Sequence, residues 1–128
     1  MRFGYTILYV EDVEQTIEFY ERAFGVQRSE IVTPEYGELA TGATVLSFAR
    51  HDIARGNSGT NFRMTHPKQL PPAFEVAFLT DDVQAAYDTA IEAGASEVNE
   101  PAEKPWGQTV AYVRDINGVL VEICTPVH

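Results

Sequence analysis

Hydrophobic and polar positions follow a pattern that occurs twice along the chain. The stretch "YTILYVEDVEQTIEFYERAFG", Tyr5 to Gly25, is echoed by "EVAFLTDDVQAAYDTAIEAGA", Glu75 to Ala95. Each copy opens with an alternating apolar run typical of a strand and then reaches an aspartate, Asp12 or Asp82, that can cap a helix. Apolar residues then recur at helical spacing, so the sequence predicts a repeated unit of one strand and one helix.

Both predicted helices carry a single apolar stripe, so we expect each to lie with one face on a sheet. The two stripes are Val13, Ile17, Tyr20 and Phe24 in the first helix, and Val83, Ala86, Tyr87, Ala90 and Ile91 in the second. Gly25 and Gly94 follow the stripes and are plausible helix stops.

Three short strand-like runs follow each predicted helix. They are "VQRSEIV", "GELAT" and "TVLSFAR" in the first half, and "SEVNE", "TVAYVRD" and "VLVEICT" in the second. Asp115 to Gly118, between the last two runs, carries the Asn-Gly signal of a tight hairpin. Each half therefore reads β-α-β-β-β, and we predict an α+β fold of two similar modules within one domain. The boundaries are about 1–50 for module 1, about 51–72 for a connecting loop and about 73–128 for module 2.

The connecting segment "HDIARGNSGTNFRMTHPKQLPP", His51 to Pro72, shows no clear periodicity. A loop of this length is uncommon in so small a domain and is usually a lid or a mobile linker. The segment also holds Arg55 and Arg63. It is therefore predicted to be either a solvated connector or a loop that covers a ligand.

Composition and charge narrow the class of protein. The chain has 128 residues, of which 45% are hydrophobic and 22% charged, which suits one globular domain. Its net charge of −10 argues against nucleic acid or an anionic membrane as partner. The charge suits a cationic small molecule, but taken alone it is better explained by solubility. We find no signal-peptide pattern or membrane span, and the single cysteine, Cys124, permits no internal disulfide. These features predict a cytoplasmic protein in which Cys124 is a small core residue.

Two acids interrupt strands that are otherwise apolar. Glu122 breaks "GVLVEICTP", and Glu75 breaks "FEVAFL" in much the same way. A buried carboxylate is costly unless it is paired, protonated or bound to something. Together they suggest an acidic spot in a cavity that binds a divalent metal, holds a cation or shares a proton. The alternative is that either acid points outward from an edge strand.

Over nearly its whole length the sequence resembles the vicinal oxygen chelate superfamily, which includes glyoxalase I, extradiol dioxygenases and the bleomycin resistance proteins. The two modules, the opening "VEDVEQTIEFYERAFG" and the ending "DINGVLVEI" carry the resemblance. It implies paired βαβββ modules that form a U-shaped cleft, and subunits that pair as homodimers. In catalytic members a divalent metal sits on the cleft floor.

The resemblance places the four usual metal-ligand positions on Tyr5, Ser47, Glu75 and Glu122. Only Glu122 matches the family's ligand pattern, because Tyr and Ser are poor ligands for zinc, nickel or iron at neutral pH. We therefore expect no cofactor. The departure resembles the binding members of the superfamily, such as the bleomycin resistance proteins, which sequester a cationic drug without a metal.

The segment "KPWGQTVAYVRD" is similar to the one in which those binding proteins place an aromatic residue and a glycine before a cleft strand. By this resemblance, Trp106 stacks on a flat ligand, with Gln108 and Tyr112 as polar contacts. The alternative is that Trp106 packs under a loop.

Three functions follow as hypotheses. The first is a homodimeric protein that binds a small molecule, such as an antibiotic or a toxic metabolite, in a cleft lined by Tyr5, Ser47, Glu75, Trp106, Gln108, Tyr112 and Glu122. The second is a metal-dependent glyoxalase-like lyase, epimerase or dioxygenase in which Glu75 and Glu122 hold a divalent metal, helped by Tyr5 or His51. The third is a dimeric module with no catalytic role.

Overall fold

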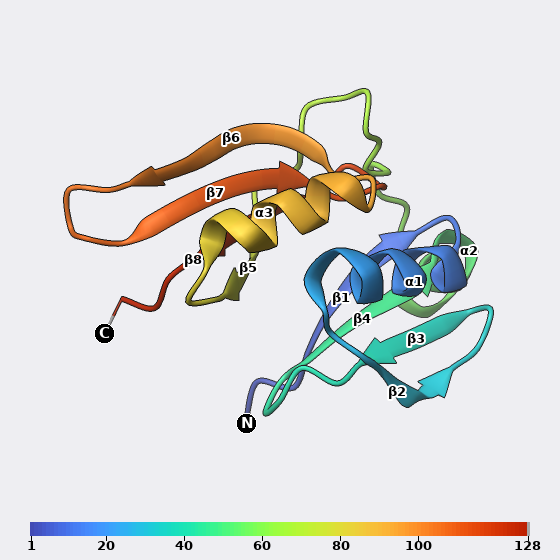
Figure 1. Ribbon diagram of the computed structural model, residues 1–128. Coiled ribbons are helices and arrows are strands. Elements are labelled where there is room, and N and C mark those ends of the chain that lie inside the picture. The colour runs from blue at the N-terminus through green and yellow to red at the C-terminus, as the bar shows by residue number, and fades with distance from the viewer. Residues whose placement is uncertain (128) are drawn as a thin grey trace. The chain divides into compact units, whose positions relative to one another are not determined.

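The computed structural model describes residues 1–127, which divide into two compact units (Figure 1). Unit 1 comprises Met1–Glu21 and Gly25–Met64, and unit 2 comprises Arg22–Phe24 and the described chain from Thr65 onward. Each unit holds one four-stranded sheet. Among the described residues, no helix is long and apolar enough to cross a membrane.

The first module holds β1 (Tyr5–Val10), α1 (Val13–Phe24), β2 (Arg28–Val32), β3 (Tyr36–Leu39), β4 (Val45–Arg50) and α2 (His51–Ser58), all in unit 1 except the last three residues of α1, which belong to unit 2. The second module holds β5 (Glu75–Leu79), α3 (Val83–Glu92), β6 (Ser96–Glu103), β7 (Thr109–Arg114) and β8 (Leu120–Cys124). The prediction of an α+β fold with two βαβββ modules is confirmed.

The two sheets have the same topology. Their strand orders are β1-β4-β3-β2 and β5-β8-β7-β6. In each sheet the first strand of the module runs parallel to the last, and the remaining pairs are antiparallel. β1 and β5 are therefore edge strands of their own sheets, whereas β4 and β8 each lie between two neighbours.

Helix α1 begins and ends where the sequence signals lie. The Asp12 carboxylate accepts a hydrogen bond from the backbone N–H of Gln15 (2.9 Å), and Gly25 ends the helix in the left-handed region at φ 68°. On the buried side, Ile17 and Tyr20 are fully enclosed. The Tyr20 ring packs on Phe48 of β4 with ring centroids 5.0 Å apart, so α1 and the sheet share one core.

Helix α3 repeats this arrangement in unit 2. Asp82 accepts a hydrogen bond from the Ala85 backbone N–H (3.0 Å), and Val83, Tyr87 and Ala90 are buried. Figure 1 shows α3 along one face of its sheet, where Val113 of β7 is fully enclosed. One face of the sheet therefore packs against α3 in the core. Side chains that could bind a ligand are expected on the opposite face of the sheet.

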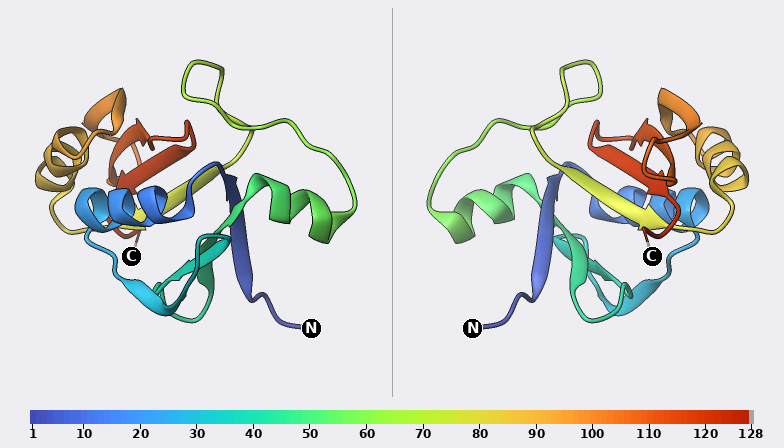
Figure 2. Two further views of the ribbon diagram at one scale, coloured as in Figure 1. Left: turned by 90° about the vertical axis from the view of Figure 1, so that its right-hand side faces the viewer. Right: turned by 90° about the vertical axis from the view of Figure 1, so that its left-hand side faces the viewer.

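The connecting segment differs from the expected loop at its start, where residues 51–58 form helix α2. Only Ala54 of this helix is buried, and its N-terminal residue has no side-chain cap. After α2 the chain runs without helix or strand from Gly59 to Phe74 (Figure 2). The loop prediction therefore holds for the second part of the segment and is wrong for the first.

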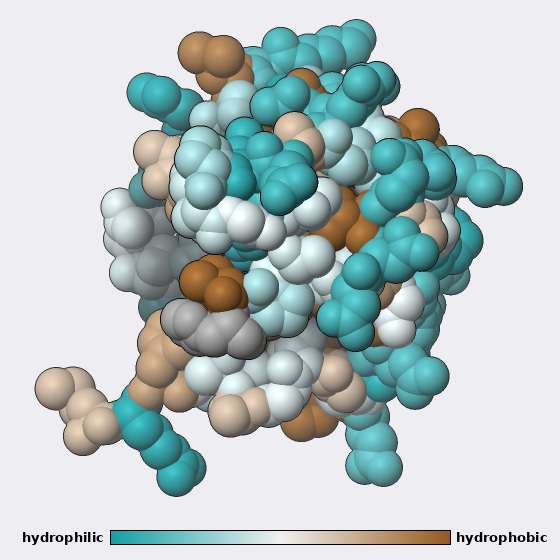
Figure 3. Space-filling model, turned by 60° about the vertical axis from the view of Figure 1, so that its left-hand side comes forward, coloured by the Kyte–Doolittle hydropathy of each residue, from teal (hydrophilic) through white to brown (hydrophobic). Residues whose placement is uncertain are grey.

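The face of the molecule in Figure 3 is mainly hydrophilic, with separate hydrophobic residues rather than one continuous apolar area.

Candidate functional site

The two interrupting acids of the sequence lie in unit 2, on strands β5 and β8. Glu122 pairs with Ala77 of β5 on one side and with Tyr112 of β7 on the other. Its neighbours in sequence, Val121 and Ile123, are 0% and 1% exposed and face the core. Because successive strand residues point to opposite faces, Glu122 and Tyr112 lie on the face opposite α3.

Tyr112 and Glu122 form a hydrogen-bonded pair. The Tyr112 hydroxyl donates to Oε1 of Glu122 over 2.7 Å, and both side chains are half-buried. This hydrogen bond, together with burial, raises the pKa of Tyr112 far above its usual value. Tyr112 is therefore a fixed donor at any physiological pH.

The pKa of the second acid, Glu75, is changed in the opposite direction from the pKa of Glu122. Burial and the adjacent Glu122 raise the pKa of Glu75. Burial also acts to raise the pKa of Glu122, but hydrogen bonds from Cys124, Tyr112 and Glu75 outweigh it and the net pKa is lowered. Glu122 thus holds the negative charge of the pair, and a proton is retained longer on Glu75.

The surroundings of the two acids are not the same. Glu122 is half-buried on an inner strand, whereas Glu75 is exposed on an edge strand. The expectation of a shared acidic spot agrees with their close interaction, but Glu75 is not enclosed. The outward-facing alternative therefore describes Glu75 better than Glu122.

Cys124 takes the structural role expected for it. Its side chain is a free thiol only 2% exposed, two residues from Glu122 on the same face of β8. Burial and the neighbouring Glu122 raise the pKa of this thiol to about 12. The thiol stays protonated and is a poor nucleophile.

Two consecutive hydrogen bonds connect the Trp106 side chain to the backbone through Gln108. Its indole N–H donates to Oε1 of Gln108 (2.8 Å), and Nε2 of Gln108 donates to the Thr125 carbonyl (2.7 Å). The Trp106 side chain is nevertheless 65% exposed. The alternative that Trp106 packs under a loop is therefore wrong, and the indole presents an oriented aromatic face to solvent.

The two remaining predicted residues, Tyr5 and Ser47, belong to unit 1. Tyr5 is 56% exposed at the start of β1, and Ser47 on β4 is completely buried. Ser47 pairs with Ile7 of β1 and with Glu38 of β3. The expectation that all seven predicted residues share one cleft stays a prediction.

Two polar residues beside Ser47 were missed by the sequence analysis. The Tyr36 hydroxyl donates to Oε2 of Glu38 over 2.8 Å. Burial raises the pKa of Tyr36, as does Glu38, while the nearby Ser47 acts to lower it. A signal was present in "YGEL", where the tyrosine and the glutamate alternate on one strand face, but it requires the β3–β4 register to show that they adjoin Ser47.

His51, the suggested helper of a metal site, opens helix α2. Burial, followed by the charge of Arg55, lowers its pKa. Its ring lies 5.7 Å from that of Phe62, which also packs on Tyr9 at 4.7 Å. His51 is thus part of an aromatic cluster within unit 1.

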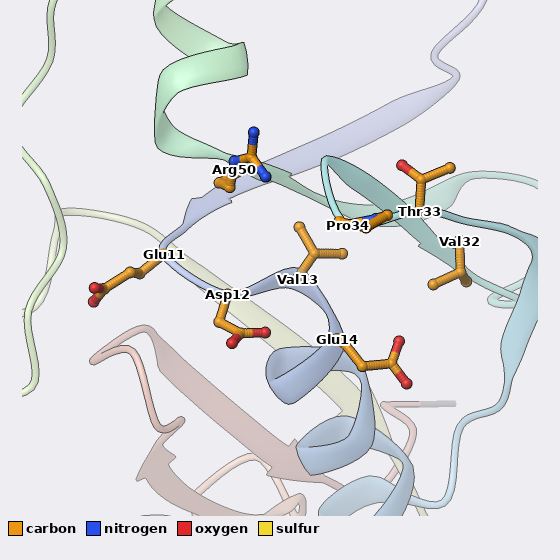
Figure 4. A pocket seen from close by; sticks show the side chains of 8 residues that line it. All are labelled: Glu11, Asp12, Val13, Glu14, Val32, Thr33, Pro34 and Arg50. Atoms are coloured by element: carbon orange, nitrogen blue, oxygen red, sulfur yellow. The ribbon is translucent and has the colours of Figure 1, made fainter.

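A pocket of about 360 Å³ lies elsewhere in unit 1 (Figure 4). It is lined by Glu11, Asp12, Val13, Glu14, Val32, Thr33, Pro34 and Arg50. Most of its charged groups are engaged: Asp12 caps α1, Glu14 pairs with Arg28 (2.8 Å) and Arg50 pairs with Asp52. The pocket contains none of the predicted site residues, and most of its charged side chains already have partners within the protein.

The donors in unit 2 do not fit a transition-metal site. Zinc, nickel and iron sites in this family's pattern use imidazole and carboxylate, whereas the groups that interact with Glu122 are the Glu75 carboxyl, the Tyr112 phenol and the Cys124 thiol. Among residues 1–127, no group of three or more His, Cys, Asp or Glu side chains is arranged to hold a metal ion. We therefore derive no step through a metal.

Comparisons with known proteins agree with this fold. A probable lactoylglutathione lyase from Vibrio cholerae is 25% identical to the chain, over 95% of the chain and 88% of that protein. A glyoxalase-related enzyme from Fulvimarina pelagi superposes with a TM-score of 0.85 at 19% identity, covering 98% of this chain and 88% of the other. A glyoxalase/bleomycin resistance protein/dioxygenase family enzyme from Burkholderia phytofirmans gives a TM-score of 0.79 at 22% identity, with 95% and 96% covered.

At 19% and 22% sequence identity, the similarity to these two solved structures shows a common fold. Membership of a family is shown by a match to the family's sequence profile. The profile of the Glyoxalase/Bleomycin resistance protein/Dioxygenase superfamily matches residues 2–123. The match spans both βαβββ modules and ends at Ile123 in the last strand. The chain therefore belongs to the glyoxalase/bleomycin resistance protein/dioxygenase superfamily.

Proposed function

We propose that the chain is a cytoplasmic, homodimeric small-molecule-binding protein that takes a cationic or hydrogen-bond-donating ligand, such as an antibiotic or a toxic metabolite, at the Glu75–Glu122 pair. The observation that carries the proposal is the half-buried Glu122 carboxylate, which is kept ionised by the Tyr112 donor and lies beside a second acid. A cation bound there would offset the repulsion between the two carboxylates.

Trp106 supports a flat, aromatic part in the same ligand. Gln108 directly precedes β7, and strand alternation continued to this position would place its side chain on the face that carries Val110 and Tyr112. Four residues of a strand span about 13 Å, which sets the separation between the Gln108 anchor of Trp106 and the acidic pair. The ligand class is a planar ring system joined to a protonated nitrogen at about this distance.

The experiment is a thermal-shift screen of planar, cationic and phosphonate-type compounds against four proteins. These are the wild type, Glu122→Gln, Trp106→Ala and the control Glu92→Gln, which removes an exposed carboxylate from helix α3. We expect cationic planar hits on wild type and control, with shifts at least halved in the two site variants. Equal shifts for all four proteins would contradict the assignment of Glu122 and Trp106.

A second candidate function rests on the relative from Vibrio cholerae, which is named as a probable lactoylglutathione lyase. On this hypothesis the chain is a metal-dependent lyase that uses Glu75 and Glu122. Elemental analysis after dialysis, with a glyoxalase I assay in added zinc or nickel, separates the candidates. We expect substoichiometric metal and negligible activity, whereas one tightly held metal per chain would favour the lyase.

The homodimer is tested separately by light scattering coupled to size exclusion. Exposed apolar side chains in and before β1, Phe3, Tyr5, Ile7 and Tyr9 at 69%, 56%, 44% and 37% exposure, support self-association. A mass of one chain at micromolar concentration would contradict the dimer and leave the binding proposal intact.

A further inference from the structure

The part of the connecting segment that follows helix α2 is attached to unit 1 mainly through one side chain. After α2 ends at Ser58, the chain as far as Met64 has no helix or strand (Figure 2). Every residue from Gly56 to Met64 is exposed except Phe62, which is half-buried. Phe62 is therefore the point at which this stretch packs on unit 1.

Three side chains of unit 1 surround the Phe62 ring. The ring lies 4.7 Å from that of Tyr9 on β1 and 5.7 Å from that of His51 at the start of α2. The Arg55 guanidinium lies over the ring, 5.0 Å from its centroid, and Nε of Arg55 donates to Oδ1 of Asn61 over 3.0 Å. We call the packing of Phe62 on Tyr9, His51 and Arg55 the Phe62 anchor.

A second attachment holds the following part of the segment to unit 2. The Arg114 guanidinium donates to the backbone carbonyls of His66 and Pro67, each over 3.2 Å. An arginine stays charged at every physiological pH, so this attachment does not depend on protonation. Loss of the Phe62 anchor would therefore free the segment at its unit 1 end and leave its unit 2 end attached.

His51 is the titratable member of the Phe62 anchor. Its Nε2 is closed to solvent and, within the described chain, has no hydrogen-bond partner. A neutral imidazole can leave one nitrogen as a bare acceptor, whereas a protonated ring carries N–H on both nitrogens and needs an acceptor for each. His51 is also the first residue of α2, at the positive end of the helix, where a further cation is unfavourable.

The charges around His51 act in both directions. Burial has the largest effect on its pKa and lowers it, as does the charge of Arg55, whereas Glu11, the Tyr9 backbone and Asp52 act to raise it. The net pKa lies below the ordinary value of 6.5, so His51 is harder to protonate when anchored than when free. The stabilisation from the anchor is thus fully present above about pH 6.5 and is lost as the pH falls through the lowered pKa.

We propose that His51 is a pH-sensitive switch for the connecting segment: protonation of its ring releases Phe62 from Tyr9 and frees residues 59–65 from unit 1. Release uncovers the Tyr9 ring and adds Phe62 to the surface, so the acid form presents more aromatic surface than the neutral form. The switch involves neither Glu75 nor Glu122, so it does not depend on the binding function proposed above.

The test is an NMR titration of the ¹⁵N-labelled chain between about pH 7.5 and about pH 5, the range in which histidine titrates. The {¹H}–¹⁵N NOE reports the mobility of residues 59–64, and the imidazole signals report the titration of His51. We expect the NOE to fall with pH at the same midpoint as the His51 titration. The equilibrium constant for anchoring should fall about tenfold for each pH unit by which that midpoint lies below 6.5.

Three variants complete the experiment. His51→Gln has no titrating ring, so residues 59–64 should show no pH-dependent release. His66→Gln is the matched control, because His66 is an exposed histidine of the same segment, and it should keep the wild-type transition. Phe62→Ala should be mobile at both pH values, which checks that the NOE reports the anchor.

Three results would overturn the proposal. They are an unchanged transition in His51→Gln, a transition that disappears in His66→Gln, and residues 59–64 that are equally rigid at both pH values in the wild type. If His51→Gln is mobile at every pH because glutamine does not pack on Phe62, the wild-type midpoints decide. Coincident midpoints of the NOE and the His51 ring then support the switch, and separate midpoints refute it.

Discussion

At the scale of single residues, the charge on Glu122 depends on the groups that donate to it. Burial alone would favour the neutral acid. Hydrogen bonds from Cys124, Tyr112 and Glu75 reverse this tendency and lower the pKa of Glu122. Only the Tyr112 bond can be removed with little change of shape, because Phe differs from Tyr by one oxygen.

Replacing Tyr112 with Phe is expected to raise the pKa of Glu122 by about one unit, since a hydrogen bond to a charged group contributes about 1.5–3 kcal/mol and part of it is replaced by water. A ¹³C NMR titration of the glutamate carboxyls measures this value directly. Tyr36→Phe, which removes the equivalent donor from Glu38, is the control and should leave Glu122 unchanged. An unaltered Glu122 titration in Tyr112→Phe would show that the 2.7 Å contact does not stabilise the charge.

Glu75 gives a prediction about stability and pH. Its pKa is raised above the usual 4.5 in the folded protein, so its ionisation is harder when folded than when unfolded. Its stabilising contribution is present below about 4.5 and is lost as the pH rises through the folded pKa. Glu75→Gln should therefore be more stable than the wild type at neutral pH, by less than about 1 kcal/mol because the side chain is exposed.

Thermal unfolding of both proteins across the acid range checks this expectation. The difference in melting temperature should shrink toward zero as the pH falls to about 4.5, where the unfolded carboxyl is half-protonated. A variant that melts lower than the wild type at neutral pH would contradict the repulsion between Glu75 and Glu122.

The residue scale is also where sequence reasoning was least complete. Glu75 and Glu122 stood out because each interrupts an apolar strand. Glu38 did not stand out, because "GELAT" is a polar stretch in which an acid is unremarkable. Glu38 pairs with Ser47 through the register of β3 and β4. That register depends on the pairing of the two strands in the folded sheet and cannot be recognised from the local sequence pattern.

At the scale of elements, local signals predicted the structure wherever one face of an element is buried. The capping aspartates, the helical stripes and the Asn-Gly turn all appear where expected. Helix α2 was missed because it buries one residue and has no side-chain cap. Strand β6 extends to Glu103 and is exposed at nearly every position, so it has no hydrophobic alternation to reveal its length.

The β7–β8 hairpin gives an element-scale prediction at Gly118. This residue has φ 98°, and an added Cβ would lie 2.8 Å from the His66 carbonyl oxygen and 2.8 Å from Nη2 of Arg114. Arg114 in turn donates to the backbone of Gly118, Pro67 and His66, which ties the connecting segment to the hairpin. Gly118→Ala should therefore destabilise the protein by about 1–3 kcal/mol.

Urea denaturation measures this loss, and Gly56→Ala is the matched control. Gly56 lies inside α2 with nothing within 4 Å of an added Cβ and no positive φ. Alanine there should stabilise by about 0.4–1 kcal/mol, because it restricts the unfolded chain and favours the helix. Opposite signs for the two substitutions are expected, and a neutral Gly118→Ala would show that the hairpin tolerates a different turn.

At the scale of the whole molecule, the internal repeat is what made the fold predictable. One module alone shows a strand, a helix and three short strands of uncertain pairing. Two copies in one chain show that the order is not accidental, and the superfamily profile covers both. The ligand was not predictable in the same way, because a fold shared by many activities leaves function to particular side chains.

Net charge and the acidic pair together determine how cation binding should respond to solution conditions. With a net charge of −10, the protein attracts cations over a distance that becomes shorter as salt is added, so binding of a cation should weaken as ionic strength rises.

The Glu75–Glu122 pair responds to pH because Glu75 retains a proton above the usual 4.5. A cationic hit from the screen should therefore bind more tightly as the pH rises from about 4.5 and Glu75 ionises, and should displace a proton while Glu75 is still partly protonated. Isothermal titration calorimetry in two buffers of different ionisation enthalpy measures that proton release. Glu75→Gln should bind without proton release and with little pH dependence, and an unchanged pH profile in this variant would show that another group controls binding.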